Sequence, residues 1–148
     1  MGDVRDLRSA ASLRRARGPA AVDAVVLPPA TSTPRRARHW VMNRVAAVGI
    51  GGCTNQYAEL LTGEVVANAV VHGPATGEVR IELSMDAAVV RVSVSDDGHG
   101  HPRPRHPEPT ALSGRGLAIV EALSSAWGTH TSPTGGTTVW FELEVDAD

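Results

Sequence analysis

The chain has 148 residues, a formal net charge of −2 and a pI near 6.3. This predicts one domain with its own hydrophobic core and gives no electrostatic reason to expect nucleic acid as the main partner. All 14 basic residues are arginine, which excludes P-loop nucleotide binding and every other mechanism that needs a lysine. The single Cys53 can form no internal disulfide, and no Cys/His zinc pattern is present, which suits a reducing cytoplasm.

The first 20 residues contain five arginines among small residues and predict a flexible arm ahead of a single domain over residues 21–148. A solvated tail is the simplest interpretation of this arm, and a specific docking arm is the alternative. Neither a signal peptide nor a membrane span is expected, because Asp23 and Pro28-Pro29 interrupt the only apolar stretch that follows.

Turn residues and hydrophobic periodicity divide the domain into strands and helices in the order β-α-α-β-β-loop-α-β-β. Helical periods and alternating stretches follow one another without an internal repeat. The expected elements are a strand over 21–27, a helix from Thr33 as N-cap to Gly49, a helix capped by Thr54 or Asn55 and ending at Gly73-Pro74, strands over 79–85 and 90–94, a proline-rich loop over 97–113, a helix over 116–126, a short strand near 128–131 and a strand over 137–145.

This order predicts an α+β fold, a two-layer α/β sandwich. The sheet is expected to be mixed and mostly antiparallel, because the two central strands pair as a hairpin. About three helices would cover one face of it.

Glu64 and Asn68 interrupt a largely apolar run and lie four residues apart, so they share one face of the second helix. A carboxylate there can act as a base, and an amide oxygen is a suitable ligand for Mg²⁺. The alternative is that both are ordinary helix residues at the solvent edge.

Asp96 has the same register as Val90, Val92 and Val94, so it should point inward at the end of its strand. A carboxylate in that position can accept a hydrogen bond from an exocyclic amine such as adenine N6, and the following Gly98 and Gly100 let the backbone approach a flat ligand. A simple Asp-Gly hairpin turn is the alternative, although the proline-rich stretch that follows is poorly suited to a returning strand.

Two further candidates follow the loop. Gly114, Arg115, Gly116 and Leu117 are expected to open a helix, whose free amides and the arginine would favour phosphate. A loop-to-helix hinge explains this motif as well. Thr137 shares the inward register of the last strand and could support the adenine contact, or be an ordinary strand threonine.

The other aromatic and imidazole groups are assigned no site. His99, His101 and His106 lack cysteines and sufficient carboxylates nearby, so mobile imidazoles are favoured over zinc. The three tryptophans are too scattered for a nucleic-acid stacking platform, and core packing or helix docking is expected for them.

Four segments together resemble the GHKL superfamily, which includes gyrase, Hsp90, histidine kinases and MutL. EVVANAVVHG resembles the EAxxNAxxHG helix, DDGHG the DxGxG turn, GRGLAIVEALSSAWG the GxGL helix and GGTTVWFEL the closing strand of the small anti-sigma serine kinases and their actinobacterial relatives. The likeness covers residues 21–145. Sensor histidine kinases are disfavoured, because they usually carry asparagine at the position of Glu64 and a lysine at the position of Val71.

The resemblance implies a Bergerat-type fold that binds ATP and Mg²⁺. Glu64 would be the catalytic base of phosphoryl transfer and Asn68 the Mg²⁺ ligand, while Asp96 would contact adenine with support from Thr137. The glycines of both glycine motifs, with Arg115 and Leu117, would line the nucleotide pocket: Gly98, Gly100, Gly114 and Gly116.

The resemblance further implies a cytoplasmic regulator of transcription. It would be a serine/threonine kinase toward an antagonist of the STAS type, would often sequester a sigma factor, and its relatives often form homodimers. The loop between Gly100 and Gly114 is short and proline-rich, which leaves a second function open: an ATP-binding protein-interaction module with little or no kinase activity. A small structural domain without nucleotide is the third alternative.

Overall fold

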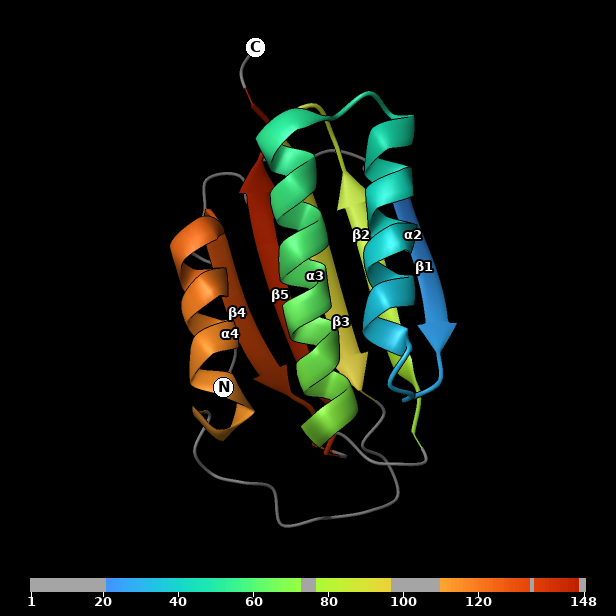
Figure 1. Ribbon diagram of the computed structural model, residues 1–148, viewed down its shortest axis with the longest axis vertical. Helices are drawn as coiled ribbons and strands as arrows, with labels where there is room; N and C mark the ends of the chain where they lie inside the picture. The colour runs from blue at the N-terminus through green and yellow to red at the C-terminus, as the bar shows by residue number, and fades with distance from the viewer. Residues whose placement is uncertain (1–20, 73–76, 97–109, 134, 147–148) are drawn as a thin grey trace.

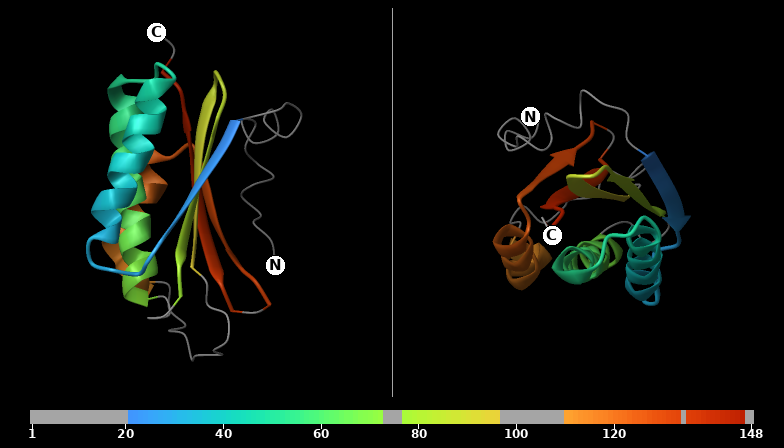
Figure 2. Two further views of the ribbon diagram at one scale, coloured as in Figure 1. Left: turned by 90° about the vertical axis from the view of Figure 1, so that its right-hand side faces the viewer. Right: turned by 90° about the horizontal axis from the view of Figure 1, so that it is seen from above.

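The computed structural model describes residues 21–72, 77–96, 110–133 and 135–146. Within these ranges five strands form one sheet in the order β1-β2-β3-β5-β4, and three helices pack on one face of it (Figures 1 and 2). The expected two-layer α/β sandwich is therefore confirmed. Each neighbouring pair of described strands is antiparallel, so the sheet contains no parallel pair in this part of the chain.

The elements follow the expected order along the chain. Figure 1 shows α3 between α2 and α4, with β1 and β4 at the two edges of the sheet. Their bounds are β1 Ala21–Leu27, α2 Thr33–Ala47, α3 Gly52–His72, β2 Val79–Met85, β3 Val89–Asp96, α4 Thr110–Leu123, β4 Ala126–Thr131 and β5 Thr137–Glu144.

The helix ends differ in detail from expectation. Ser32, not Thr33, is the N-cap of α2, because the Thr33 hydroxyl instead donates to the Pro28 carbonyl at 2.5 Å. The end of α2 is as expected: Gly49 has a φ of 88°, and its N–H bonds the Ala46 carbonyl, which is a glycine C-cap.

The start of α3 also departs from the expected caps. The helix begins at Gly52, so Thr54 and Asn55 lie inside its first turn. The Thr54 hydroxyl donates to the Glu144 carbonyl at 3.3 Å, and the Asn55 amide donates to the Met42 carbonyl at 3.3 Å. These side chains tie α3 to β5 and to α2, so tertiary contacts replace the expected local caps.

Strand alternation separates the sheet into a helical face and an open face. On the helical face lie Val79, Ile81, Leu83 and Met85 of β2, Val90, Val92 and Val94 of β3, and Phe141 and Leu143 of β5, all of them buried. They pack with apolar side chains of the helices to form one core. Burial of this apolar surface is the main stabilising contribution to the fold.

Candidate functional site

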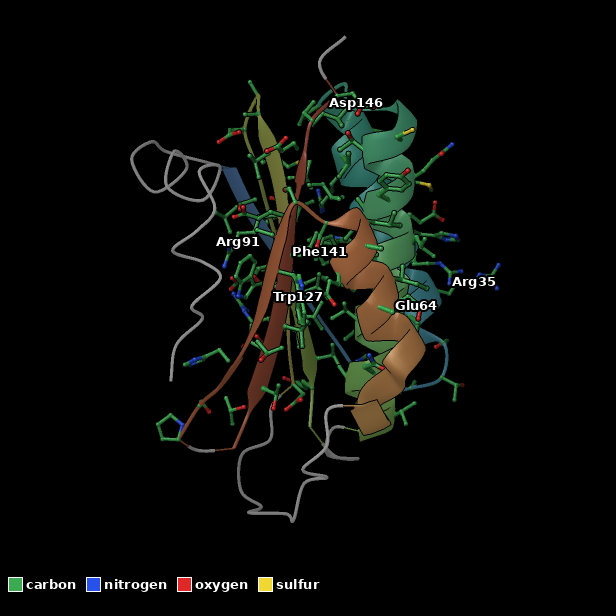
Figure 3. All side chains as sticks on the ribbon, turned by 90° about the vertical axis from the view of Figure 1, so that its left-hand side faces the viewer. Arg35, Glu64, Arg91, Trp127, Phe141 and Asp146 are labelled. Carbon is green, nitrogen blue, oxygen red and sulfur yellow. The ribbon has the colours of Figure 1, made fainter. Side chains whose placement is uncertain are left out.

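Glu64 and Asn68 lie one turn apart on the same flank of α3 and are both half-buried. The neighbouring Gly63 packs against α2, since a Cβ at this position would lie 2.6 Å from Cδ of Arg38. At about 3.6 residues per turn, Glu64 and Asn68 project from a different side of the helix than Gly63 does. The pair therefore lies toward α4, and Figure 3, viewed from that side, shows Glu64 within the helical layer.

Asp96 is the last residue of β3, and its register continues that of the buried Val90, Val92 and Val94. Its Oδ1 accepts a hydrogen bond from the backbone N–H of Thr137 at 3.3 Å. Thr137 is the first residue of β5, so the strand pairing joins two residues separated by 41 positions. The structure thus places these two predicted site residues together at one end of the sheet.

The elements that carry the two halves of the candidate site run toward the same end of the molecule. In Figure 1, β3 and α3 both run toward the lower end, where Asp96 and the last turns of α3 are found. The helix contributes Glu64 and Asn68, and the sheet contributes Asp96 and Thr137. One carboxylate of the candidate site therefore comes from each layer.

The expected start of the third helix is wrong. α4 begins at Thr110, so Gly114, Arg115, Gly116 and Leu117 lie inside the helix and not ahead of it, and their amides belong to its second turn. Only the first turn of a helix has unbonded N–H groups, so free amides at this motif are not supplied by α4. The helix also ends at Leu123 and is followed by β4 from Ala126, where a helix to residue 126 had been expected.

Several predicted residues lie outside the described part of the chain. These are Gly98 and Gly100, together with His99, His101 and His106 and most of the expected loop. The backbone of α4 is described at its glycine motif, and Gly116 is buried there.

A hollow of about 410 Å³ lies beside Asp96, on the open face of the sheet. Strand residues and the turn before β5 line it, and none of its lining residues belongs to α3 or α4. It is therefore separate from the flank that carries Glu64. The lining residues are Val26, Glu78, Arg80, Ser95, Asp96, Ser132, Gly136 and Thr138.

Sequence reasoning missed one pair in this hollow. The hydroxyls of Ser95 and Thr138 lie 2.8 Å apart and come from directly opposed positions on β3 and β5. Alternation along each strand shows that these residues face away from Asp96, but the pairing of β3 with β5 was needed to bring them together.

The side-chain oxygens of Glu64 and Asn68 suit a divalent ion that a bound ligand also coordinates. Among the described residues, no group of three His, Cys, Asp or Glu side chains could hold a metal. Glu64 and Asn68 nevertheless present two hard oxygen donors from one half-buried flank. Mg²⁺ commonly takes only one or two protein ligands and completes its shell with water and phosphate oxygens, so these residues fit such an ion.

The protein-family model for the histidine kinase-like ATPase domain matches residues 27–143 of the sequence. A crystal structure of the RsbU and RsbW domains of Rv1364c from Mycobacterium tuberculosis is similar in fold, with a TM-score of 0.62 and 26% sequence identity. The similarity covers 86% of this chain but 33% of the other, so the chain spans about a third of the length of that structure. No curated protein matches the sequence. Among the described residues, none of the helices combines the length and apolar character that crossing a membrane requires.

Proposed function

The chain belongs to the histidine kinase-like ATPase domain family, and from this we propose that it is an ATP- and Mg²⁺-binding serine kinase of the anti-sigma type. Its partners would be a STAS-type antagonist that it phosphorylates, a sigma factor that it sequesters, or both. One observation carries the proposal: a family match over residues 27–143 contains Glu64 and Asn68 on one flank of α3 and Asp96 at the adjoining end of the sheet.

Asp96 is suited to adenine because its carboxylate is oriented. The Thr137 N–H holds Oδ1 at 3.3 Å, and an ionised carboxylate accepts several hydrogen bonds. An exocyclic amine that approaches the end of the sheet would donate to this group. The hydroxyl-bearing Thr137 would lie beside it.

Asn68 would hold Mg²⁺ through its amide oxygen, and the ion, when bound, would neutralise charge on the phosphates. Glu64 lies one turn earlier on the same flank and is half-buried. Its carboxylate would accept a hydrogen bond from a seryl hydroxyl of the partner and orient that oxygen toward the γ-phosphorus. Because the two residues lie one helical turn apart, the seryl oxygen and the phosphate would be held within a single site.

A surface for an acidic partner is offered by α2. The helix contains four arginines, Arg35, Arg36, Arg38 and Arg44, and no acidic residue. Arg35, Arg36, His39 and Arg44 are exposed, and Figure 3 shows Arg35 extending away from the sheet. Concentrated positive charge of this kind favours the encounter with a negatively charged protein surface.

Titration with a fluorescent ATP analogue, with and without Mg²⁺, tests the nucleotide site. We expect saturable binding that strengthens when Mg²⁺ is added. Asp96→Asn should abolish it, because the new amide turns one acceptor oxygen into a donor. If the unmodified chain shows no saturable binding even at millimolar analogue, the proposal is wrong and a structural domain without nucleotide is favoured.

Glu64→Gln separates the kinase from a binding module. We expect ATP binding to persist and transfer of labelled phosphate to a STAS-type protein to disappear. Glu59→Gln is the matched control, since it makes the same change of charge on the same helix and should leave transfer intact. Undiminished transfer by Glu64→Gln would contradict the role of Glu64, whereas an unmodified chain that binds ATP but transfers none would be the interaction module.

Replacement of both Arg35 and Arg36 by glutamate tests the partner surface. We expect weaker capture of the sigma factor or antagonist and an unchanged affinity for the ATP analogue, because the α2 surface and the Glu64 flank of α3 are separate. Capture that survives this reversal of charge would exclude α2 as the docking surface.

A further inference from the structure

The strand β1 forms one edge of the sheet. Among the described strands it pairs with β2 alone, and the pairing runs from Ala21 to Leu27 without a bulge. The strand contains neither proline nor lysine, and its one charged residue is Asp23. Edge strands are commonly protected from further pairing by proline, lysine or a bulge. Because β1 has none of these, its backbone is suited to accept an added strand.

The side chains of β1 present an apolar row on the open face of the sheet. Val22, Ala24 and Val26 alternate along the strand with Asp23 and Val25, which belong to the helical face. Val22 is 62% exposed and Val26 is 44% exposed. Pairs of β-branched side chains on neighbouring strands stabilise a sheet, so an added strand with apolar residues on this face would bury both valines.

The helical side of the same edge is basic. Arg36, Trp40 and Arg44 succeed one another at four-residue spacing, so they form one stripe along α2. Arg44 Nη1 lies 3.8 Å from Asp23 Oδ2, which shows that the stripe faces β1, and Figure 2 shows α2 beside this strand. The guanidinium carbon of Arg44 lies 4.8 Å from the centroid of the Trp40 ring.

Both arginines of this stripe are accessible. Arg36 is exposed, and the side chain of Arg44 remains 46% exposed beside Asp23. Two cations and a single carboxylate leave an excess of positive charge along the edge, which favours an acidic ligand.

We propose that β1 and the arginine stripe of α2 form one docking site for an extended acidic segment of a partner protein. The segment adds to the sheet beyond β1, where main-chain hydrogen bonds provide affinity and alternate side chains provide selectivity. Its apolar side chains cover Val22 and Val26, and its acidic side chains face Arg36 and Arg44. The inference rests on the partner surface proposed above for α2 and adds the mode of binding, without involving nucleotide.

Helix geometry sets the spacing of the acidic residues in the segment. Arg36 and Arg44 are eight residues apart, which is about 12 Å along a helix. Four residues of a strand span a similar distance, roughly 13 Å, and residues four apart lie on the same side of a strand. Acidic residues at positions i and i+4 therefore reach both arginines, while apolar residues at i+1 and i+3 lie on the side of the valines.

An acidic segment fits this edge better than a second copy of the chain. Antiparallel pairing of two β1 strands would bring the arginine stripes of both copies to one junction. The α2 helix has four arginines and no acidic residue, so like charges would oppose each other there.

Titration of the full ¹⁵N-labelled chain with a synthetic peptide tests the docking by NMR. The peptide has blocked ends and two glutamates four residues apart, with valine, threonine and valine between them. We expect saturable shifts for the amides of residues 22–26 and for the Trp40 indole, whereas His130 on the opposite edge strand should not shift. A peptide of the same composition with adjacent glutamates is the control and should bind more weakly. No saturable shift at millimolar peptide, or equal affinity for the control peptide, would overturn the proposal.

Alternate N-methylation of the peptide separates strand addition from simple charge attraction. Successive N–H groups of an added antiparallel strand point alternately toward β1 and toward solvent. Methylation of every second nitrogen should therefore abolish binding in one phase and spare it in the other. Equal binding of the two methylated peptides would contradict strand addition.

Neutralisation of the stripe tests the ionic contribution. Arg36→Gln and Arg44→Gln should each weaken peptide binding by roughly threefold, because each removes one exposed ionic contact. Gln56→Glu makes the same one-unit change of charge on α3 and should leave the affinity unchanged. Equal affinities for all three variants would exclude the arginine stripe from the docking site.

Dilution of the protein without peptide tests a second copy as the occupant. We expect the amide signals of residues 22–26 to be independent of protein concentration. A dependence on concentration would show that β1 pairs with another copy and would contradict the proposal. None of these measurements involves ATP or phosphoryl transfer, so loss of peptide binding and loss of nucleotide binding are distinguishable.

Discussion

The two faces of the sheet are made by the same strands but are stabilised in different ways. The helical face consists of aliphatic side chains and Phe141 packed against α2, α3 and α4. The open face carries an ion pair, an aromatic ring and hydroxyl groups, with Arg91 and Glu142 at its centre. Apolar packing is nondirectional, whereas the polar face depends on particular pairs of atoms.

Adjacent residues at the end of β3 show how sharply the faces differ. Asp96 belongs to the helical register and accepts the N–H of Thr137. Ser95 belongs to the other register and pairs with the Thr138 hydroxyl. Asp96 also lines the open-face hollow together with Ser95, so the candidate nucleotide site and the hollow meet at the end of β3.

The helical face should be the most sensitive to truncation. Phe141 is fully buried, so Phe141→Ala should lower the free energy of unfolding by about 3–5 kcal/mol. Ser93 lies on the open face, opposite Trp140. Ser93→Ala should change the free energy of unfolding by less than about 0.5 kcal/mol. Urea denaturation measures both, and equal losses would remove the distinction between the faces.

The ion pair should be the most sensitive feature of the open face. Arg91→Ala leaves the buried Glu142 carboxylate without its arginine and should cost about 3 kcal/mol. Arg80→Ala breaks the exposed Arg80–Glu82 pair and should cost less than about 1 kcal/mol. A similar small loss for both variants, measured by urea denaturation, would mean that Glu142 is well solvated.

Gly128 should be more sensitive to a methyl group than a glycine in open space. Gly128→Ala would place Cβ against three atoms of the Trp140 ring at 2.8–2.9 Å and should destabilise the fold by about 1–3 kcal/mol. Gly51→Ala meets no atom within 4 Å and should stay within about 0.5 kcal/mol. Thermal unfolding compares the two, and an equally neutral Gly128→Ala would show that the ring moves without cost.

The smallest effect is expected for the hydroxyl pair near Asp96. Ser95→Ala and Thr138→Ala each remove one half of a 2.8 Å hydrogen bond between half-buried groups, and each should cost under about 1 kcal/mol. A double-mutant cycle isolates the coupling. Additive losses would show that the two hydroxyls bond water instead of each other.

Much of the fold could be predicted because its strands alternate and its helices carry apolar stripes. The alternation of Val90, Val92 and Val94 correctly gave Asp96 its face. The start of α4 was misplaced, because proline-rich composition does not reveal where a helix begins to be stabilised by packing. Thr54 and Asn55 were misassigned as caps, because their side chains bond carbonyls that only tertiary packing supplies.

Part of the candidate site could likewise be predicted from the sequence, whereas the long-range contacts of the open face could not. Glu64 and Asn68 could be placed on one flank from their spacing alone, since four residues make about one helical turn. The grouping of Arg91, Glu142 and Trp140 on the open face could not be predicted, because Arg91 and Glu142 are 51 residues apart and Trp140 carries no local signal. Trp140 had been expected in core packing or helix docking, and it lies instead on the open face under Arg91.

The sequence by itself determined the periods of the elements, and with them which residues share a face. It also contained the family motifs around Glu64, Asp96 and Gly114. Only the tertiary structure decided which strands are neighbours: the order β1-β2-β3-β5-β4 brings Thr137 to Asp96 and Glu142 to Arg91. Local residue patterns fix backbone conformation over a few residues, whereas strand order depends on which long-range pairing buries the most apolar surface and satisfies the most polar groups.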